Sequence, residues 1–186
     1  MTTLSIFGQD QPERARTFTE NPAEIRELLA SHGVRFEQWP TRDLPAGASQ
    51  EEILEAYGDE VAKLQAECGF QAADVVSLNP DNPQKEAFRK KFLDEHTHRE
   101  DEVRFFVRGQ GLFYLHFGNQ VFAVLCRKND LISVPDGTRH WFDMGPEPEF
   151  TCIRLFTNPE GWAADFTGED IAARLPRYEA LAGAAG

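Results

Sequence analysis

Residues 95–104 read Glu-His-Thr-His-Arg-Glu-Asp-Glu-Val-Arg, and the fold and site expected of the chain follow from this stretch. Side chains two positions apart on an extended strand point the same way. One face of the strand would therefore carry His96, His98, Glu102 and Arg104. Two neutral imidazole nitrogens and one carboxylate oxygen that converge on a point suit a divalent transition metal. The spacing predicts a metal site on this strand.

A third histidine follows in a second unit, Pro135-Asp-Gly-Thr-Arg-His140. Pro and Gly favour a tight turn there, and His140 is predicted to begin the next strand. Gly109 is where we expect the first strand to turn. A single histidine on a strand is more often a packed or surface residue than a ligand, and we apply that interpretation to His32 and His116.

The rest of the chain divides into a helix-rich first part and a strand-rich second part. Capping residues and apolar spacing predict helices over 21–33, 49–69 and 84–93, with short strands over 34–39 and 73–78. Asn21 and Ser49 are the predicted N-caps, with Glu24 and Glu52 closing capping boxes. From about residue 95 to 157, short apolar runs alternate with turn residues, which indicates an antiparallel sandwich or barrel. Those strands are predicted over 103–107, 112–117, 121–125, 131–134 and 150–156.

Composition limits the possible partners and the compartment. The 186 residues include 19 Lys or Arg and 31 Asp or Glu, a formal charge of −12. Such a surface argues against nucleic acid, because phosphate binding relies on clustered basic residues. No stretch reaches the roughly 18 apolar residues of a membrane helix. Three widely spaced cysteines read as reduced and mostly buried, so we expect a cytoplasmic protein.

The two units resemble the two motifs of the cupin superfamily. The first motif, H-x-H-x3-E-x6-G, matches His96, His98, Glu102 and Gly109, and the second, P-x-G-x2-H, matches Pro135, Gly137 and His140. The resemblance implies a mainly β fold with peripheral helices, a cupin double-stranded β-helix (jelly-roll) barrel with a helix-rich N-terminal part. We expect one domain over 1–186, with the metal-binding barrel core over about 95–157.

Within the cupins, residues 95–104 are similar to the signature of the acireductone dioxygenase family. The likeness extends to Pro135-Asp-Gly-Thr-Arg-His-Trp-Phe142 and to Asn158-Pro-Glu-Gly-Trp162. It implies a methionine-salvage enzyme that splits 1,2-dihydroxy-3-keto-5-methylthiopentene with O2. With Fe(II) the products are formate and 4-methylthio-2-oxobutanoate. With Ni(II) they are carbon monoxide, formate and 3-methylthiopropanoate.

The family resemblance also implies roles for particular residues and one divalent metal per chain, Fe(II) or Ni(II). The metal ligands would be His96, His98, Glu102 and His140. Arg104 would help to form and hold the substrate dianion. Glu95 and Asp101 occupy positions that the family links to metal incorporation and conformational coupling.

The residues themselves agree with an anionic substrate. An unpaired guanidinium beside the metal site would be costly, and either an anionic ligand or an internal carboxylate would relieve that cost for Arg104. Arg154 is a further candidate, although alternation alone does not decide which face it occupies. Phe92, Phe142 and Trp162 are candidates for an apolar pocket wall, with the hydrophobic core as their other interpretation.

Two other functions stay open at this stage. Another metal-dependent cupin enzyme, such as a sugar isomerase or a decarboxylase, would use the same ligand types. A non-catalytic cupin that binds a small molecule is the second alternative, but such a protein should lack metal ligands or carry a DNA-binding module. All four metal ligands are present and no basic recognition helix is, which favours an enzyme, and the family resemblance implies that it acts on a small-molecule acireductone and O2. We expect a monomer, since nothing in the pattern demands a large apolar interface.

Overall fold

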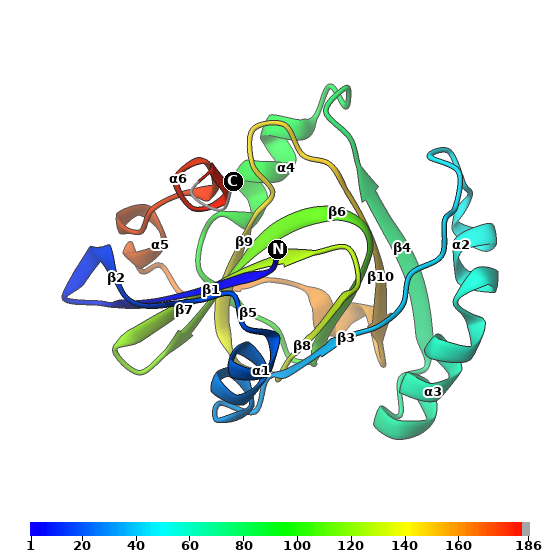
Figure 1. Cartoon of the computed structure of the whole chain (residues 1–186), viewed down its shortest axis with the longest axis horizontal. Coiled ribbons are helices and arrows are strands. Elements are labelled where there is room, and N and C mark those ends of the chain that lie inside the picture. Colours follow the sequence, from blue (N-terminus) through cyan, green and yellow to red (C-terminus); the bar gives the residue numbers. More distant parts are fainter. Residues whose placement is uncertain (184–186) are drawn as a thin grey trace.

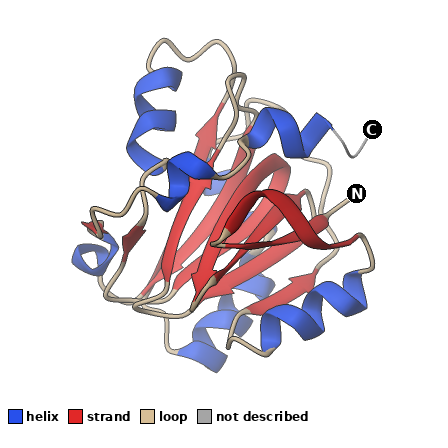
Figure 2. Ribbon diagram, turned by 90° about the vertical axis from the view of Figure 1, so that its left-hand side faces the viewer, coloured by secondary structure: helices blue, strands red, loops and turns tan. Residues whose placement is uncertain are grey.

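The structure, a computed structural model, describes residues 1–183 and is mostly β (Figures 1 and 2). The strands are β1 (Thr3–Gly8), β2 (Gln11–Thr19), β3 (Arg35–Gln38), β4 (Ala72–Leu78), β5 (His96–Thr97), β6 (Glu102–Phe117), β7 (Gln120–Arg127), β8 (Asp130–Val134), β9 (Arg139–Asp143), β10 (Phe150–Phe156) and β11 (Asp165–Phe166). The helices are α1 (Pro22–Ala30), α2 (Gln50–Ala56), α3 (Gly58–Cys68), α4 (Lys85–Phe92), α5 (Ile171–Arg174) and α6 (Tyr178–Ala182), with a 3₁₀ turn η1 (Pro159–Trp162).

Strand β6 belongs to both layers of the fold. Its first half pairs with β8 and β10, and its second half pairs with β7 and β9, all antiparallel. The predicted turn at Gly109 is therefore wrong, because the strand continues through it and changes layer. Gly109 has φ +71°, and a Cβ there would collide with the backbone carbonyl of Glu149. Glycine is required at this point for conformation and for close approach, rather than for chain reversal.

Three packed clusters follow from the alternation of side chains along the strands. Phe106 and Phe113 of β6 point between the two layers, into the main core. Phe105 points outward to Ile53 and Leu64 under α2 and α3, which lie outside β4 in Figure 1. On the opposite side of the molecule, Leu112, Tyr114 and Trp141 pack against α5. Burial on both faces explains why these strands read as nearly continuous apolar runs.

The N-terminal part contains more strand than the sequence indicated. The hairpin of β1 and β2 was not predicted, and β1 lies against β7, so it extends the sheet. Strands β3 and β4, which were predicted, pair with β8 and β10. The hydrogen-bonded path of strands stays open, with β2 at one end and β11 at the other. The expected barrel is thus enlarged by N-terminal strands and is not closed.

The predicted helices are present with two differences. Asn21 caps α1 by accepting from the backbone N–H of Ala23, but Glu24 accepts from Thr19 instead of closing a capping box. Ser49 and Glu52 do form the predicted capping box. The single helix predicted over 49–69 is two helices, because the chain leaves helical geometry at Tyr57. After Trp162 the chain forms two further short helices, α5 and α6.

The cysteines match the expected pattern, with Cys126 and Cys152 buried, Cys68 exposed and all three free. No helix within residues 1–183 is long and apolar enough to cross a membrane.

Candidate metal centre

The three predicted ligand histidines meet where β5 pairs with β9. His96 lies directly opposite His140 in that pairing, and the ligand nitrogens of His96, His98 and His140 all lie within 4.8 Å of one another. The route by which they meet differs from the prediction. Strand β5 ends at Thr97, and β6 begins only at Glu102, so the four side chains do not share one continuous strand face. The backbone bends between them, where the carbonyl of His98 accepts from the N–H of Gly137.

Backbone carbonyls orient all three imidazole rings. Nδ1 of His96 donates to the carbonyl of Asp94 at 2.7 Å, and Nδ1 of His140 donates to that of Thr138 at 2.7 Å. Nδ1 of His98 donates to the carbonyl of Ala163 at 3.2 Å. A carbonyl only accepts, so Nδ1 carries the proton, and the neutral ring presents the lone pair of Nε2 to the shared centre. This is the arrangement that a metal-ligating histidine requires.

Glu102 completes the cluster. One carboxylate oxygen, Oε2, lies 2.7 Å from Nε2 of His140 and 3.3 Å from Nε2 of His98. With Nδ1 already protonated, these contacts need either an imidazolium or a cation among the three groups. A divalent cation satisfies both nitrogens and the carboxylate together, so the donor set of three imidazoles and one carboxylate fits such a metal.

The electrostatics of the cluster favour the metal-binding forms of His96 and Glu102 but not that of His98. Burial, with a contribution from the His140 charge, lowers the pKa of His96 to about 4, which keeps that ring neutral. Burial also opposes ionisation of Glu102, but the charges of Arg104 and His140 outweigh it and hold its pKa well below the usual value. For His98, burial is outweighed by its hydrogen bond to Glu102, and its pKa is raised. Metal binding at His98 therefore competes with protonation of this ring.

Arg104 lies beside the cluster and is 5% exposed. Its Nε donates to Oε1 of Glu102 at 2.7 Å, so the internal carboxylate considered from the sequence is present. Its guanidinium carbon lies 5.3 Å from the ring centre of Phe142 and 5.8 Å from that of Trp162. The guanidinium is thus held between aromatic faces and one carboxylate, and it lines the same cavity as the ligands.

Strand register decides the orientation of Arg154, which the sequence left open. Arg154 lies directly opposite Arg104 in the pairing of β10 with β6, so both side chains are on the same face. On its other side Arg154 lies opposite Asp74 of β4, which accepts from its Nε at 2.8 Å and its Nη2 at 2.5 Å. The pattern gave no indication of Asp74, because only cross-strand register brings it to Arg154.

Three aromatic side chains border the cavity at the histidine cluster. Phe92, Phe142 and Trp162 line the cavity of about 190 Å³ that holds the ligand histidines, together with Arg104 and Arg154. A second cavity of about 300 Å³ shares Phe92, Phe142 and both arginines with it and continues past Leu78, Met144 and Phe150. Gly111 leaves room for the Phe142 ring, since a Cβ there would collide with it. The site therefore joins a polar metal-binding part to an apolar part.

Glu95 and Asp101 lie behind the cluster rather than in the cavity. Glu95 is buried, and its carboxylate binds Nδ1 of His116 at 2.5 Å and the hydroxyl of Thr167 at 2.8 Å. Asp101 accepts from the backbone N–H of Asp136 at 2.9 Å and so contacts the turn before His140. His116 is packed in the core, as the sequence suggested, and His32 stacks on Phe117 at 4.3 Å.

Two residues near the centre were missed in the sequence. Glu100 accepts from the backbone N–H groups of Thr157 and Asn158, at 2.9 Å for Asn158, and so holds the segment that carries Trp162. Lys91 lines the metal-binding cavity from the last turn of α4. The short basic run at residues 89–91 was the available signal for Lys91, but nothing in the pattern related it to the histidines.

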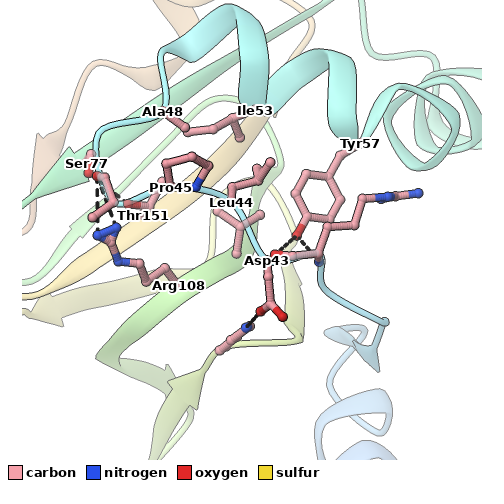
Figure 3. A pocket seen from close by; sticks show the side chains of 13 residues that line it. Asp43, Leu44, Pro45, Ala48, Ile53, Tyr57, Ser77, Arg108 and Thr151 are labelled. Atoms are coloured by element: carbon pink, nitrogen blue, oxygen red, sulfur yellow. Dashed lines mark hydrogen bonds and ion pairs between the residues drawn. The ribbon is translucent and has the colours of Figure 1, made fainter.

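Another pocket lies away from this centre, between residues 42–48 and strands β4, β6 and β10 (Figure 3). Its polar groups form hydrogen bonds and an ion pair with one another. The guanidinium of Arg108 donates to the carbonyl of Ala46, and Lys128 pairs with Asp43 at 3.3 Å. The hydroxyl of Tyr57 accepts from the backbone N–H of Arg42 at 2.7 Å. These contacts fasten the loop to the sheet and account for the pocket without a ligand.

Antiparallel strands in two layers, with three imidazoles and a carboxylate converging in an enclosed cavity, define the chain as a metal-binding cupin protein. The sequence model of the ARD/ARD′ family matches residues 4–164. The chain belongs to the acireductone dioxygenase family and is an enzyme of that family.

The chain is similar to known acireductone dioxygenases over nearly its full length. It is 77% identical to the acireductone dioxygenase of Marinobacter nauticus, with all of both chains covered, and 58% identical to that of Klebsiella oxytoca, with 95% of this chain and 99% of the relative covered. Among solved structures, acireductone dioxygenase from Bacillus anthracis, which has a cadmium ion in its active centre, matches at 31% identity. That match has a TM-score of 0.77 and covers 89% of this chain and 98% of the other. A divalent metal at the histidine cluster is consistent with that structure.

Proposed function

We propose that the protein uses O2 to split the acireductone 1,2-dihydroxy-3-keto-5-methylthiopentene in methionine salvage. The observation that carries this proposal is the cluster of His96, His98, His140 and Glu102 in one cavity with Arg104, in a chain of this family. With Fe(II) bound, the products are formate and 4-methylthio-2-oxobutanoate. With Ni(II) bound, they are carbon monoxide, formate and 3-methylthiopropanoate.

We assign His96, His98, Glu102 and His140 as the ligands of one Fe(II) or Ni(II) ion per chain. A divalent metal held by these groups would supply Lewis acidity towards an anionic substrate oxygen. The hydrogen bonds from Nδ1 to the carbonyls of Asp94, Thr138 and Ala163 fix the ring orientations before metal binds. The chain's contribution to metal binding is this fixed set of Nε2 lone pairs beside an ionised carboxylate.

Arg104 and Arg154 bind and orient the anionic substrate in this proposal. Nε of Arg104 is engaged by Glu102, and the guanidinium retains further N–H donors for the substrate oxygens. Because its charge favours the deprotonated form of a neighbouring acid, Arg104 promotes loss of the enediol protons. Arg154, held by Asp74 and lying 5.0 Å from the ring centre of Trp162, adds a second positive charge.

The aromatic wall excludes water and accepts the apolar end of the substrate. Phe92 and Phe142 border both cavities, so a substrate with its polar head group in the first cavity can place a methylthioalkyl tail in the second. Glu95 and Asp101 are assigned supporting roles. Glu95 links β5 to His116 and Thr167, and Asp101 holds the turn before His140, so both affect how the ligands are presented for metal incorporation.

We further propose that the enzyme is a cytoplasmic monomer with one functional domain, whose metal-binding core spans about residues 95–157. Among residues 1–183 the exposed large hydrophobic side chains are Met1, Phe18 and Phe166, which lie on separate segments. Such a surface gives little area for a stable homodimer. Light scattering after size-exclusion chromatography should give the mass of one chain.

The decisive experiment reloads metal-free protein separately with Fe(II) and Ni(II), mixes it anaerobically with the acireductone, and then admits O2. Keto acid and formate from the iron form, and carbon monoxide from the nickel form, are the expected products. Protein that holds one metal per chain but consumes no O2 with either metal would contradict the proposed substrate.

A further inference from the structure

The cavity at the metal centre is positively charged within a strongly negative chain. Its charged lining side chains, apart from the histidines, are Lys91, Glu102, Arg104 and Arg154. Three cations thus face one carboxylate before any metal adds its charge. The chain as a whole carries −12, a field that repels anions from most of the surface. An anion that reaches this site needs local positive charge on its way in.

Each of the two arginines already pairs with one carboxylate, which offsets part of its charge. Arg104 pairs with Glu102 at 2.7 Å, and Arg154 pairs with Asp74 at 2.5 Å. Lys91 differs from both. Within residues 1–183 it takes part in no ion pair, and its Nζ lies 5.7 Å from the ring centre of Phe92, which borders both cavities. Lys91 is exposed and lines the cavity, so its ammonium group is accessible to a ligand at the cavity edge.

We infer that Lys91 recognises the anionic head group of the substrate, drawing it into the cavity and positioning it beside the arginines. This inference rests on the proposed function and adds to it a positioning residue that the sequence motifs do not contain. The ligand class it selects is a small organic anion, an enediolate or a 2-oxo carboxylate, rather than a neutral sugar. Lys91 does not need to contact the atoms whose bonds change.

The basic run on α4 has another physical reason to exist, since positive charge at a helix C-terminus is favourable. Arg89, Lys90 and Lys91 all lie in the last turn of α4. Lys90 therefore provides a matched control, because it has the same charge and nearly the same helix position but does not line the cavity. An effect of helix electrostatics should appear equally in variants of both lysines.

Two measurements test this inference in the metal-loaded full chain. The first is steady-state kcat and KM for the acireductone, at low and at physiological ionic strength. The second is equilibrium binding of 4-methylthio-2-oxobutanoate under nitrogen, by calorimetry. Lys91→Met should raise KM and the keto acid Kd about fivefold at low salt, with kcat within about twofold, because an exposed ion pair contributes modestly. Lys91→Arg should restore both constants, and Lys90→Met should leave them unchanged.

The salt dependence separates recognition from a structural effect. The advantage of wild type over Lys91→Met should shrink as ionic strength rises, since screening weakens an exposed charge. Equal Kd values for wild type and Lys91→Met, or equal losses for Lys91→Met and Lys90→Met, would overturn the inference. If wild-type protein binds the keto acid but does not turn over the acireductone, the proposed function fails. In that case, weaker keto acid binding by Lys91→Met but not by Lys90→Met still supports anion recognition by Lys91.

Discussion

At the scale of single residues, the site depends on which nitrogen of each histidine carries its proton. Three backbone carbonyls hold the Nδ1 protons, so the Nε2 atoms face one another around Glu102. The two arginines are held in a comparable way, each by one carboxylate and an aromatic face. The geometry of the site is thus set by the groups behind its functional side chains as much as by those side chains.

Replacing His96 with Ala should remove metal binding. The change deletes one Nε2 ligand atom. Loss of an outer hydrogen-bond partner typically lowers metal affinity about 10–100-fold, and loss of a ligand should lower it further. Metal content after dialysis, measured by elemental analysis, is the readout. His32→Ala is the matched control, because His32 stacks on Phe117 outside the site and its loss should leave metal content at wild-type level. Full metal content in His96→Ala would contradict the ligand assignment.

Replacing Arg104 with Ala should separate metal binding from turnover. The metal itself neutralises Glu102, so metal content should persist, whereas kcat/KM should fall by about 10²–10³-fold because a preorganised charge at the substrate is lost. Arg108→Ala serves as control, since Arg108 lies on the same strand but contacts the carbonyl of Ala46 in the other pocket. Loss of metal together with activity in Arg104→Ala would mean that Arg104 acts through Glu102 alone.

Acid should destabilise the metal-free protein through His96. The folded state holds the pKa of this ring at about 4, whereas an unfolded chain titrates near 6.5. Between these values the unfolded state binds a proton that the folded state does not, so stability falls as the pH falls from 6.5 towards 4. The loss from this residue is at most about 3–4 kcal/mol. Urea unfolding of metal-free wild type and His96→Asn across this range should show the steeper decline in wild type, and parallel curves would refute the assignment.

At the scale of elements, β6 connects the layers and depends on Gly109. Gly109→Ala would impose a side chain at φ +71° and against the carbonyl of Glu149, so it should cost more than about 2 kcal/mol. Gly118→Ala is the control. Gly118 also has positive φ, at +58°, but a Cβ there meets nothing within 4 Å, so only the conformational cost of about 1 kcal/mol applies. Equal losses in chemical denaturation would show that β6 adapts at Gly109.

Local sequence signals predicted where helices begin but not which distant strands pair. Asn21 and Ser49 begin helices where their capping patterns predicted, because an N-cap involves only neighbouring residues. The hairpin of β1 and β2 escaped prediction because β2 is largely polar and exposed, and β1 is stabilised by pairing with β7, more than one hundred residues away. Gly109 and Gly111 read locally as a turn, but both are explained by close approach of segments distant in the sequence.

At the scale of the whole molecule, the metal should contribute to the stability of the fold. The ligands come from β5, the segment after it, β6 and β9, so one ion bound to them joins parts of both layers. Binding to the folded state alone adds about 4 kcal/mol when free metal is 1,000 times its Kd. Chelation should therefore lower the Tm by about 10 °C, and added metal should restore it. The Tm of His96→Ala should not respond to chelator. An unchanged wild-type Tm on chelation would show that metal binding at the cluster does not stabilise the fold.

The sequence by itself determined the chemistry of the candidate site. The ligand types, the spacing of His96, His98, Glu102 and His140, and the family likeness can all be read from the chain. The structure brings these four side chains together, and the family model matches the sequence. Arg104, Phe92, Phe142 and Trp162 were candidates from the sequence, and all four line the cavity.

Only the tertiary structure decided how these groups are held. Asp74 meets Arg154 through strand register, Glu100 holds the segment of Trp162, and Lys91 reaches the cavity from a helix outside the motifs. The physical reason is that side-chain chemistry and capping are local, whereas cross-strand register and cavity lining arise from contacts between residues far apart in the chain, which leave no periodic trace in the sequence.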